Sequence, residues 1–316
     1  MSAPKEFRVT LETVTPLFLG GAEPRSDPPE LRASAFRSAM RYWFRVTAGG
    51  VIGDHNLEGL HKLESALFGS QNAGSPIALQ VSGNPSSSKH FILPHKQSGP
   101  RKAFDSEQEI TLTIRARSGT SDLIFLNVCM ALNLALLFGG VGLRSRRGFG
   151  SLRVAESSDA KIIPPTPMTL DNDKWKKRIE IITTSAITWA TKLAESMNVP
   201  VTGLPNAPTN FPSAAKGGLI RLTKIEDDDS EEILKTLIGS MPQVNYLGGI
   251  FPHQNPSRQS SPLWARVFWA DDGYHLLMCF LPSKLAKNAH NDYAKIKPFL
   301  DSKFPGIDLT IPGWNA

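Results

Sequence analysis

The chain repeats one order of strands and helices, and this order limits its possible folds more than any other feature. It opens with Phe7–Thr15, where apolar and polar residues alternate and β-branched residues are frequent, which indicates a strand. The other elements expected in this half are helices at Leu31–Ala48, Leu57–Phe68 and Asp122–Phe138 and strands at Ile77–Val81, Glu109–Arg117 and Ser151–Val154. We expect Gly49-Gly50 to end the first helix and the polar, serine-rich stretch Gly83–Pro100 to be irregular.

A similar order restarts after Ile162–Pro167, a proline-rich segment that we interpret as a stiff linker. The elements expected beyond it are helices at Asp173–Met197, Ser230–Ile238 and Leu285–Leu300, a strand at Gly218–Ile225, and a hairpin of Trp264–Trp269 and Tyr274–Leu281. Short strands interleaved with helices, twice over, favour two α+β domains of the ferredoxin-like type over one doubly wound sheet. We predict that these domains occupy residues 1–163 and 164–316.

The length is that of two ordinary globular domains or one large domain, and the positive charge either favours an anionic partner or serves solubility alone. The chain has 316 residues, 41% of them hydrophobic, and a formal net charge of +6, which favours anionic partners. Cys129 and Cys279 lie far apart within apolar runs, so we expect free, buried thiols in a reducing cytoplasm. Met1–Arg8 is too polar for a signal peptide, and the longest apolar run, Leu123–Phe138, falls short of the roughly 18 residues that span a bilayer. We predict a cytoplasmic protein without a membrane segment.

An arginine stripe occupies one face of the helix expected at Leu31–Ala48. Arg37, Arg41 and Arg45 are each four residues apart, so their side chains stack on one helical face. Like charges at this spacing repel by about 0.2–0.5 kcal/mol per pair, and no acidic residue lies within the helix. Either a bound anion or carboxylates from elsewhere in the fold must compensate the stripe.

A second basic motif is the run GGVGLRSRRGFG at Gly139–Gly150, which follows an apolar helix and precedes a short strand. Glycine lets the main chain approach a ligand closely, and arginine offers a planar fork that matches phosphate oxygens. A Rossmann fingerprint requires strand, glycine loop and helix in that order, and a Walker loop requires a lysine and a hydroxyl residue after its last glycine, so the run is neither. We interpret it as an arginine-bearing nest that follows a phosphate chain; a basic turn of purely structural value is the alternative.

The sequence carries no recognisable catalytic constellation. Its histidines do not form an HExxH motif or share zinc-ligand spacing with the cysteines. We interpret the acidic run Glu226–Glu232 as a solvated loop in preference to a cation site. His90, His95 and His253 lie on expected loops, from which a histidine could act on a scissile phosphate, but nothing distinguishes them from ordinary surface histidines. We therefore expect no catalytic residue, no metal and no cofactor.

Four ordered motifs between residues 9 and 153 resemble those of a known family. They are TPLFLGGA at Thr15–Ala22, PELRASAFRSAMRYW at Pro29–Trp43, LFG at Leu67–Gly69 and the run at Gly139–Gly150. Together they are similar to the RAMP superfamily of CRISPR proteins, specifically to subunit one of the Cmr (type III-B) effector complex. One difference is that Ser38 and Phe44 stand where the family often has glycine and a second tryptophan.

The resemblance implies two fused ferredoxin-like, RRM-like units and a non-catalytic place in an antiviral ribonucleoprotein. The subunit would lie near the 3′ end of the guide RNA, where it would contact guide RNA (crRNA), target RNA and other RAMP subunits, while other subunits cleave the target. The residues that we predict to bind RNA are Arg37, Arg41, Arg45, Gly140, Gly142, Arg144, Ser145, Arg146, Arg147 and Phe149. The rings of Phe149 and Tyr42 could stack on a base, but we favour core packing for both.

Two other functions compete with this interpretation. The main alternative is a metal-independent RAMP endoribonuclease that processes guide precursors, with His90 or His95 at the scissile phosphate. A small-molecule phosphate-binding enzyme is a weaker one. Loss of cleavage in EDTA on substitution of either histidine would identify the nuclease, and saturable nucleotide binding without RNA affinity would identify the small-molecule enzyme.

Overall fold

The computed structural model describes residues 5–21, 28–93, 98–167, 171–225, 227, 229–241, 247, 249–250, 258–284 and 293–316. The elements of its first half are β1 (Glu6–Thr13), α1 (Ala33–Ile52), α2 (Leu57–Phe68), β2 (Ile77–Ser82), β3 (Ser87–Leu93), β4 (Ser98–Phe104), β5 (Glu109–Ala116), α3 (Asp122–Phe138) and β6 (Leu152–Ser157). Those of its second half are α4 (Asn172–Ser196), β7 (Leu219–Lys224), α5 (Ser230–Gly239), β8 (Gly249–Ile250), β9 (Arg258–Gln259), β10 (Leu263–Ala270), β11 (Gly273–Phe280), α6 (Ile296–Lys303) and β12 (Ile307–Leu309).

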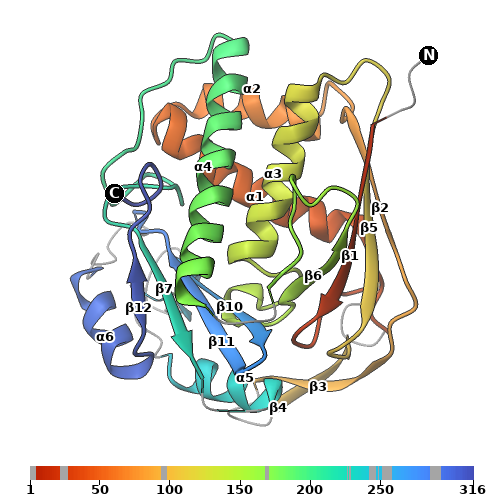
Figure 1. Ribbon diagram of the computed structural model, residues 1–316, viewed down its shortest axis with the longest axis vertical. Coiled ribbons are helices and arrows are strands. Elements are labelled where there is room, and N and C mark those ends of the chain that lie inside the picture. Colours follow the sequence, from red (N-terminus) through yellow and green to blue (C-terminus); the bar gives the residue numbers. More distant parts are fainter. Residues whose placement is uncertain are drawn as a thin grey trace.

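Each half of the chain forms a four-stranded antiparallel sheet with the same topology (Figure 1). The strand order is β2-β5-β1-β6 in the first sheet and β10-β11-β7-β12 in the second. In both sheets the four strands and their helices follow one another as β-α-β-β-α-β, which is the ferredoxin-like arrangement. The predicted fold class is therefore confirmed, and we call these the first unit (β1 to β6) and the second unit (β7 to β12).

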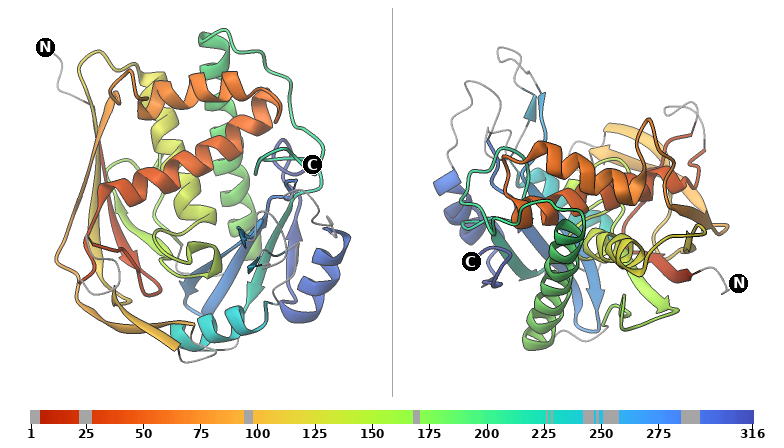
Figure 2. Two further views of the ribbon diagram at one scale, coloured as in Figure 1. Left: turned by 180° about the vertical axis from the view of Figure 1, so that it is seen from behind. Right: turned by 90° about the horizontal axis from the view of Figure 1, so that it is seen from above.

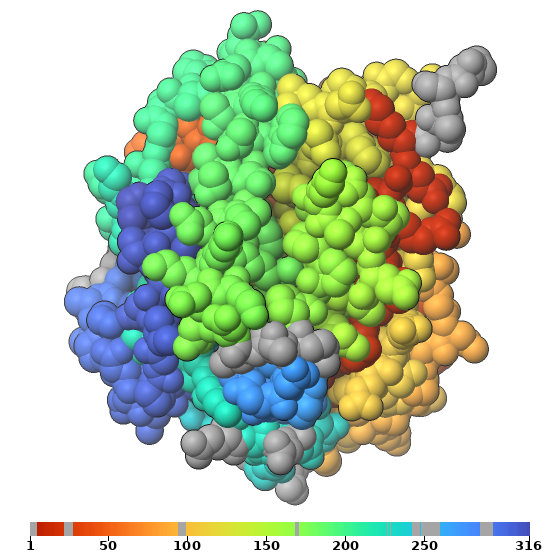
Figure 3. All heavy atoms as spheres, in the orientation of Figure 1, coloured from red at the N-terminus to blue at the C-terminus, as the bar shows by residue number. Residues whose placement is uncertain are grey.

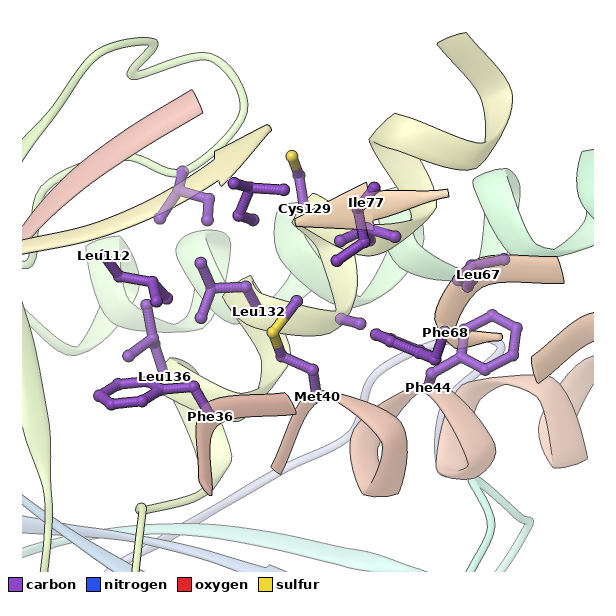
Figure 4. Close-up of a cluster of buried hydrophobic side chains, with 14 of the residues drawn as sticks. Phe36, Met40, Phe44, Leu67, Phe68, Ile77, Leu112, Cys129, Leu132 and Leu136 are labelled. Atoms are coloured by element: carbon purple, nitrogen blue, oxygen red, sulfur yellow. The ribbon is translucent and has the colours of Figure 1, made fainter. Parts of the chain in front are cut away.

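The helices α1 and α3 lie between the two sheets. One side of α3 packs with Leu112 and Ile114 of the first sheet, and its other side packs with Phe268 and Leu277 of the second. The side chains that α1, α2, α3 and the first sheet contribute to their shared core converge in Figure 4. Because α3 is enclosed on all sides, every residue from Asn127 to Phe138 is buried, which explains why it is the longest apolar run of the sequence.

The two sheets differ in how they are covered. In β1 of the first sheet buried residues alternate with exposed or half-buried ones, so only one face of this sheet is packed. In β11 of the second sheet all eight residues are buried. The helices α5 and α6 cover the outer face of the second sheet through residues such as Leu237 and Leu300, and α1, α3 and α4 cover its inner face.

The long helix α4 follows the predicted linker and joins the cores of both units. Ala190 and Leu193 pack with the first unit, whereas Trp175 and Ile182 pack with the second. The segment 162–167 forms no regular element, and it is held against α3 because Asn133 Nδ2 donates a hydrogen bond to the carbonyl oxygen of Ile162 at 3.0 Å. The boundary predicted between residues 163 and 164 stays a prediction, since the cores are shared across it.

One predicted helix end is wrong, because α1 runs through Gly49-Gly50 to Ile52. The last turn of α1 packs against residues 211–214, where a Cβ on Gly50 would lie 2.9 Å from that of Ala214 and one on Gly49 would overlap Ser213. The two glycines thus allow a close approach inside the helix, and the cost of glycine in a helix is offset by this packing. The helix ends at Gly53, whose φ of 78° favours glycine.

Three further differences concern weakly patterned segments. The stretch Gly83–Pro100, predicted to be irregular, contains β3 and the first three residues of its partner β4, and the two strands form an antiparallel ribbon. The strands β8, β9 and β12 were not predicted, because each is two or three residues long and has no readable alternation. The helix predicted at Leu285–Leu300 overlaps α6 only from Ile296 onward; residues 285–292 lie outside the described ranges.

Candidate nucleic-acid interface

The arginine stripe of α1 faces α2, which supplies the missing carboxylate. Arg41 Nε donates to Glu64 Oε1 at 2.5 Å, and Arg45 donates from Nη2 to the same oxygen at 2.7 Å and from Nε to the other. The Glu64 side chain is only 7% exposed, whereas those of Arg41 and Arg45 are 39% and 45% exposed. One buried carboxylate therefore fixes two arginines that keep part of their surface in solvent (α1 and α2 lie side by side in Figure 2).

The electrostatics of this cluster favour its charged form. Burial alone would raise the pKa of Glu64, but hydrogen bonds from Arg45 and Arg41 outweigh burial and lower the pKa below its ordinary value. The hydrogen bonds that Arg45 donates to Glu64 raise the pKa of Arg45. Two guanidinium groups share one carboxylate, so the cluster retains a net positive charge.

Glu64 was missed by the sequence analysis, although a signal was present. It lies four residues after Leu60 and three before Leu67, on the apolar face of α2. An acid at a core-facing position must find a cation, because unpaired carboxylates are almost never buried. The carboxylate that compensates the stripe thus comes from another helix, which was one of the two possibilities left open by the sequence.

The glycine-arginine loop at 139–150 is folded onto the segment that carries the TPLFLGGA motif. Leu143 N donates to Phe18 O and Gly150 N donates to Pro16 O, both at 3.0 Å. Gly142 has a φ of 88°, and a Cβ at this residue would overlap the carbonyl of Phe18. Two motifs that lie more than a hundred residues apart in the sequence are therefore one structural feature, and Gly142 is required by the closeness of the two backbones.

Arg147 and Phe149 of the loop help to join it to the second unit. Arg147 donates from Nη1 to Ser261 Oγ at 2.9 Å and from Nη2 to Leu247 O at 2.7 Å. Burial lowers the pKa of Arg147 to about 10, with a further contribution from the charges of Arg144 and Arg146. Phe149 is buried and packs edge-on against Phe18 at a ring-centroid distance of 5.1 Å, so the core packing favoured for this ring is confirmed.

Arg146 lies at the junction of the loop with α1 and β10. Its guanidinium carbon is 5.0 Å from the ring centre of Tyr42 and 4.9 Å from that of Trp264, and its Nη1 donates to the carbonyl of Ser261. Trp264 Nε1 donates to the Tyr42 hydroxyl at 2.9 Å, and burial raises the pKa of that hydroxyl. The two rings hold the guanidinium in place, so Tyr42 serves the packing that the sequence favoured for it.

These groups border one open groove with a volume of about 1210 Å³. Arg41, Tyr42 and Arg45 line it from α1, and Arg146 lines it from the loop. The remaining lining residues are Leu57, Glu58, Leu60, His61, Lys62, Glu64, Ser65, Gly69, Ser70, Gln71, Asn72, Phe211 and Pro212. The groove thus joins three of the predicted RNA-binding arginines, and its cationic side chains outnumber its acidic ones.

The other predicted residues do not line this groove. Arg37 is half-buried one turn before Arg41, and its Nη1 donates to the carbonyl of Phe68 at 3.3 Å. Arg144 and Ser145 are half-buried in the loop, and Arg144 has a φ of 58°. Gly140 is buried. None of these positions by itself tests the prediction that the residues bind RNA.

The open face of the first sheet differs from an RNA-stacking platform. RNA-recognition motifs place aromatic rings on this face, where bases stack. Among the described residues, the exposed positions of β1, β2, β5 and β6 carry no aromatic side chain. They carry ion pairs instead, including Arg115 with Glu6 at 2.5 Å and Arg153 with Glu12 at 2.5 Å.

His90, the candidate of the nuclease alternative, connects the two units. Its Nε2 lies 2.9 Å from Asp105 Oδ1, and its Nδ1 lies 2.5 Å from Glu231 Oε1 at the start of α5. Both ring nitrogens are therefore engaged by carboxylates. The other two candidates, His95 and His253, lie outside the described residues.

The acidic run and the cysteines have ordinary structural surroundings. In the run, Asp229 caps α5 by accepting a hydrogen bond from Glu231 N; Glu226 and Asp228 lie outside the described ranges. No group of histidine, cysteine and acidic residues in the described part of the chain is arranged to hold a metal ion. Cys129 and Cys279 are free and buried, as predicted, and burial raises the pKa of both thiols.

Comparison with known proteins identifies the family. The RAMP superfamily model matches residues 10–153. The Cmr subunit Cmr1-2 of Pyrococcus furiosus is 30% identical over 178 residues, which cover 46% of this chain and 92% of that protein. The chain belongs to the Cmr1 family of the RAMP superfamily. Cmr1-1 of the same organism is 27% identical over 143 residues, which cover 41% of this chain and 42% of that protein.

Two solved structures share this fold over nearly the whole chain. The crystal structure of apo Cmr1 from Pyrococcus furiosus matches with a TM-score of 0.67 at 19% identity, covering 98% of this chain and all 100% of that one. A chain of the type III-B Cmr-beta complex, bound to cognate target RNA and AMPPnP, matches with a TM-score of 0.65 at 14% identity, covering 93% and 98%. Within the described residues of this family member, none of the helices has the length and apolar character to cross a bilayer.

Proposed function

We propose that this Cmr1-family chain is a non-catalytic, RNA-binding subunit of a type III-B Cmr ribonucleoprotein in antiviral defence. Its partners would be guide RNA, target RNA and other RAMP subunits, and its contacts would lie near the 3′ end of the guide. Family membership supports a place in the complex, and the relatives named above include a chain of a Cmr complex bound to target RNA. The groove supports the binding of RNA.

The observation that carries the proposal is the union of two basic motifs in one groove. Arg41 and Arg45 lie four residues apart on α1, and Arg146 reaches the same groove from the loop. Because the side chains of Arg41 and Arg45 are about two-fifths exposed, their remaining N–H groups can donate to phosphate oxygens. We propose that these three arginines contact the RNA backbone. We add Arg37, which precedes Arg41 and Arg45 on the stripe of α1.

Three other loop residues have a supporting part in this proposal. Arg147 donates to the second unit, Phe149 packs in a core shared by Phe18 and the second unit, and Gly142 permits the close contact with Phe18. They hold Arg146 at the groove. Binding through phosphates has no sequence preference of its own, so recognition of the target would come from base pairing with the guide.

We also infer that His90 does not act as a nuclease residue, because both of its nitrogens are held by carboxylates. Incubation of the protein with repeat RNA in EDTA tests this inference. We expect intact RNA. Cleavage by the wild type that is lost in His90→Ala would establish the nuclease function instead.

The salt dependence of RNA binding tests the groove. Fluorescence anisotropy with a single-stranded guide RNA gives the slope of log K against log salt, and each phosphate contact contributes about 0.7 to that slope. We expect Arg41→Ala and Arg45→Ala each to reduce the slope by about this amount. Arg115→Ala, on the open face of the first sheet, is the matched control and should leave the slope unchanged. An unchanged slope in both α1 variants would exclude the groove.

A further inference from the structure

A second open groove, with a volume of about 570 Å³, lies between α3, α4 and the segment after β6, and we call it the α3–α4 groove. Figure 3 shows α4, in green, beside the segment after β6, in lime. The described residues that line it differ throughout from those of the groove that we assign to RNA. They are Leu126, Met130, Asn133, Ala160, Lys161, Ile162, Pro164, Lys174, Lys177, Arg178, Ile181, Ile182, Ser185 and Trp189.

Hydrogen bonds between its three walls hold the α3–α4 groove in shape. Asn127 Nδ2 on α3 donates to the carbonyl oxygen of Trp189 on α4 at 3.0 Å. Asn133 Nδ2, also on α3, donates to the carbonyl oxygen of Ile162 in the third wall at 3.0 Å. A preformed groove needs little ordering when a ligand binds, so these bonds favour binding.

The floor of the α3–α4 groove is mainly aliphatic. Ile181 of α4 has 55% of its surface exposed, and Leu126 of α3 and Ile162 of the third wall are half-buried. Apolar side chains from all three walls therefore reach solvent in one groove. Contiguous apolar surface of this kind is typical of an interaction site.

The α3–α4 groove is also positively charged. Lys161, Lys174, Lys177 and Arg178 line it, and no acidic side chain is among its described lining residues. Lys174 lies 3.5 Å from Asp171, whereas Lys161 and Lys177 form no ion pair within the part of the chain that the structure describes. Charge complementarity therefore requires an acidic ligand.

The aromatic content of the α3–α4 groove favours a protein ligand over RNA. Single-stranded RNA binds largely by stacking its bases on aromatic rings. Trp189 is the one aromatic residue among the described lining residues, and Lys192 Nζ lies over its ring at 4.5 Å from the ring centre. The aliphatic side chains of the floor suit leucine or isoleucine better than a base.

The length of the α3–α4 groove fits a helix. Lys177, Ile181, Ser185 and Trp189 lie four residues apart on one face of α4 and line the groove along about 18 Å, given a rise of 1.5 Å per residue. This length corresponds to about three turns of a helix. A helix packs well into the space between two neighbouring helices, because the ridges of side chains on one fit the grooves of the others.

We propose that the α3–α4 groove docks an acidic amphipathic helix of a partner protein. Apolar side chains at every third or fourth position of that helix enter the aliphatic floor, and its carboxylates pair with Lys161 and Lys177. The proposal goes beyond RNA binding and does not depend on it, because the two grooves are lined by different residues.

Fluorescence anisotropy with the full chain and a labelled synthetic helical peptide tests the proposal. The peptide carries leucine at every third or fourth position and glutamate at most others; in a charge-reversed peptide, lysine replaces each glutamate. We expect the acidic peptide to bind about tenfold more tightly than the charge-reversed one. Equal affinities of the two peptides, or no binding of the acidic one, would overturn the proposal.

Variants at exposed positions of α4 locate the binding to this groove. We expect Ile181→Gln to weaken binding of the acidic peptide about tenfold and Lys177→Gln about threefold. The matched controls are Ile307→Gln, at an exposed isoleucine of β12, and Lys176→Gln, next to Lys177 but outside the lining, and both should leave the affinity unchanged. Losses in the controls equal to those in the α4 variants would exclude the groove.

Arg41→Ala separates this proposal from that of RNA binding. It should leave the affinity for the acidic peptide unchanged, and Ile181→Gln should leave the affinity for guide RNA unchanged, so either proposal can fail alone. A loss of RNA affinity in Ile181→Gln, with no binding of the acidic peptide, would show that the α3–α4 groove takes nucleic acid instead.

Discussion

The arginines of α1 and those of the loop at 139–150 occupy different environments. Arg41 and Arg45 share the buried carboxylate of Glu64 and keep about two-fifths of their side-chain surface exposed. The guanidinium of Arg147 donates hydrogen bonds to Leu247 and Ser261 in the second unit. The comparison shows that two equally basic motifs differ in function according to the acceptors that the fold brings to them: the first presents charge at a groove, and the second fixes the position of one arginine, Arg146, at its edge.

The largest effect is expected where the loop meets the Phe18 backbone. Gly142→Ala places a Cβ against the carbonyl of Phe18 at a φ of 88°, so we expect a loss of about 3 kcal/mol in the free energy of unfolding. Urea denaturation measures it. The matched control is Gly74→Ala, because a Cβ on Gly74 meets no atom within 4 Å, and its effect should stay within about 0.5 kcal/mol. Equal stabilities of the two variants would show that the loop is not rigidly held.

A smaller effect is expected from titration of the α1 cluster. The folded-state pKa of Glu64 lies below its ordinary value of 4.5, so its contribution to stability is complete above that value and is lost as the pH falls through the folded pKa. Because both arginines are more than a third exposed, we expect this contribution to be only about 1 kcal/mol.

Urea unfolding of the wild type and of Glu64→Gln between neutral and acidic pH measures this contribution. The wild type should be more stable at neutral pH, and the difference should shrink as the carboxyl group is protonated. A difference that is independent of pH would mean that the ion pairs with Arg41 and Arg45 add nothing to stability.

RNA affinity is expected to change in the opposite direction to stability. In Glu64→Gln the arginines lose their carboxylate and turn more of their donors toward the groove, so we expect about threefold tighter RNA binding, or about 0.7 kcal/mol. Glu58→Gln is the matched control. Glu58 lines the same groove, so its substitution removes the same charge without releasing an arginine. Anisotropy titrations at fixed salt compare the two, and equal gains would mean that net charge alone controls binding.

The smallest effect on RNA affinity is expected on the open face of the first sheet. Arg153→Ala breaks a half-buried ion pair with Glu12, for which we expect a loss of no more than about 1 kcal/mol in stability and no change in RNA affinity. Urea unfolding measures the stability, and fluorescence anisotropy measures the RNA affinity. A clear loss of RNA affinity would move the binding surface from the groove to the sheet.

The sequence predicted the fold well because its strong elements are patterned locally. The helices at Leu57–Phe68 and Asp122–Phe138 have the predicted bounds, and the repeated order of elements indicated two ferredoxin-like units. The end of α1 was wrong because the contact of Gly49-Gly50 with residues 211–214 is non-local. The ribbon of β3 and β4 was missed because exposed strands that pair mainly with each other need no apolar alternation.

The sequence predicted which arginines lie at the candidate site but not which residues hold them in place. The spacing of Arg41 and Arg45 indicated a shared face, which the structure confirms. The pairing depends on contacts between distant parts of the chain. Glu64 compensates the two arginines from another helix, and Trp264 of the second unit helps to hold Arg146. An acidic residue on the apolar face of a helix was the one local signal of these contacts.

The enclosed position of α3 has a consequence for synthesis of the protein. The residues of α3 that face the second sheet, such as Leu134 and Phe138, leave the ribosome long before their partners Phe268 and Leu277 exist. During that interval the nascent first unit exposes an apolar surface that only later translation covers. A ribosome that stalls between the two units therefore leaves a chain prone to aggregation, and chaperone demand should peak before β10 and β11 emerge.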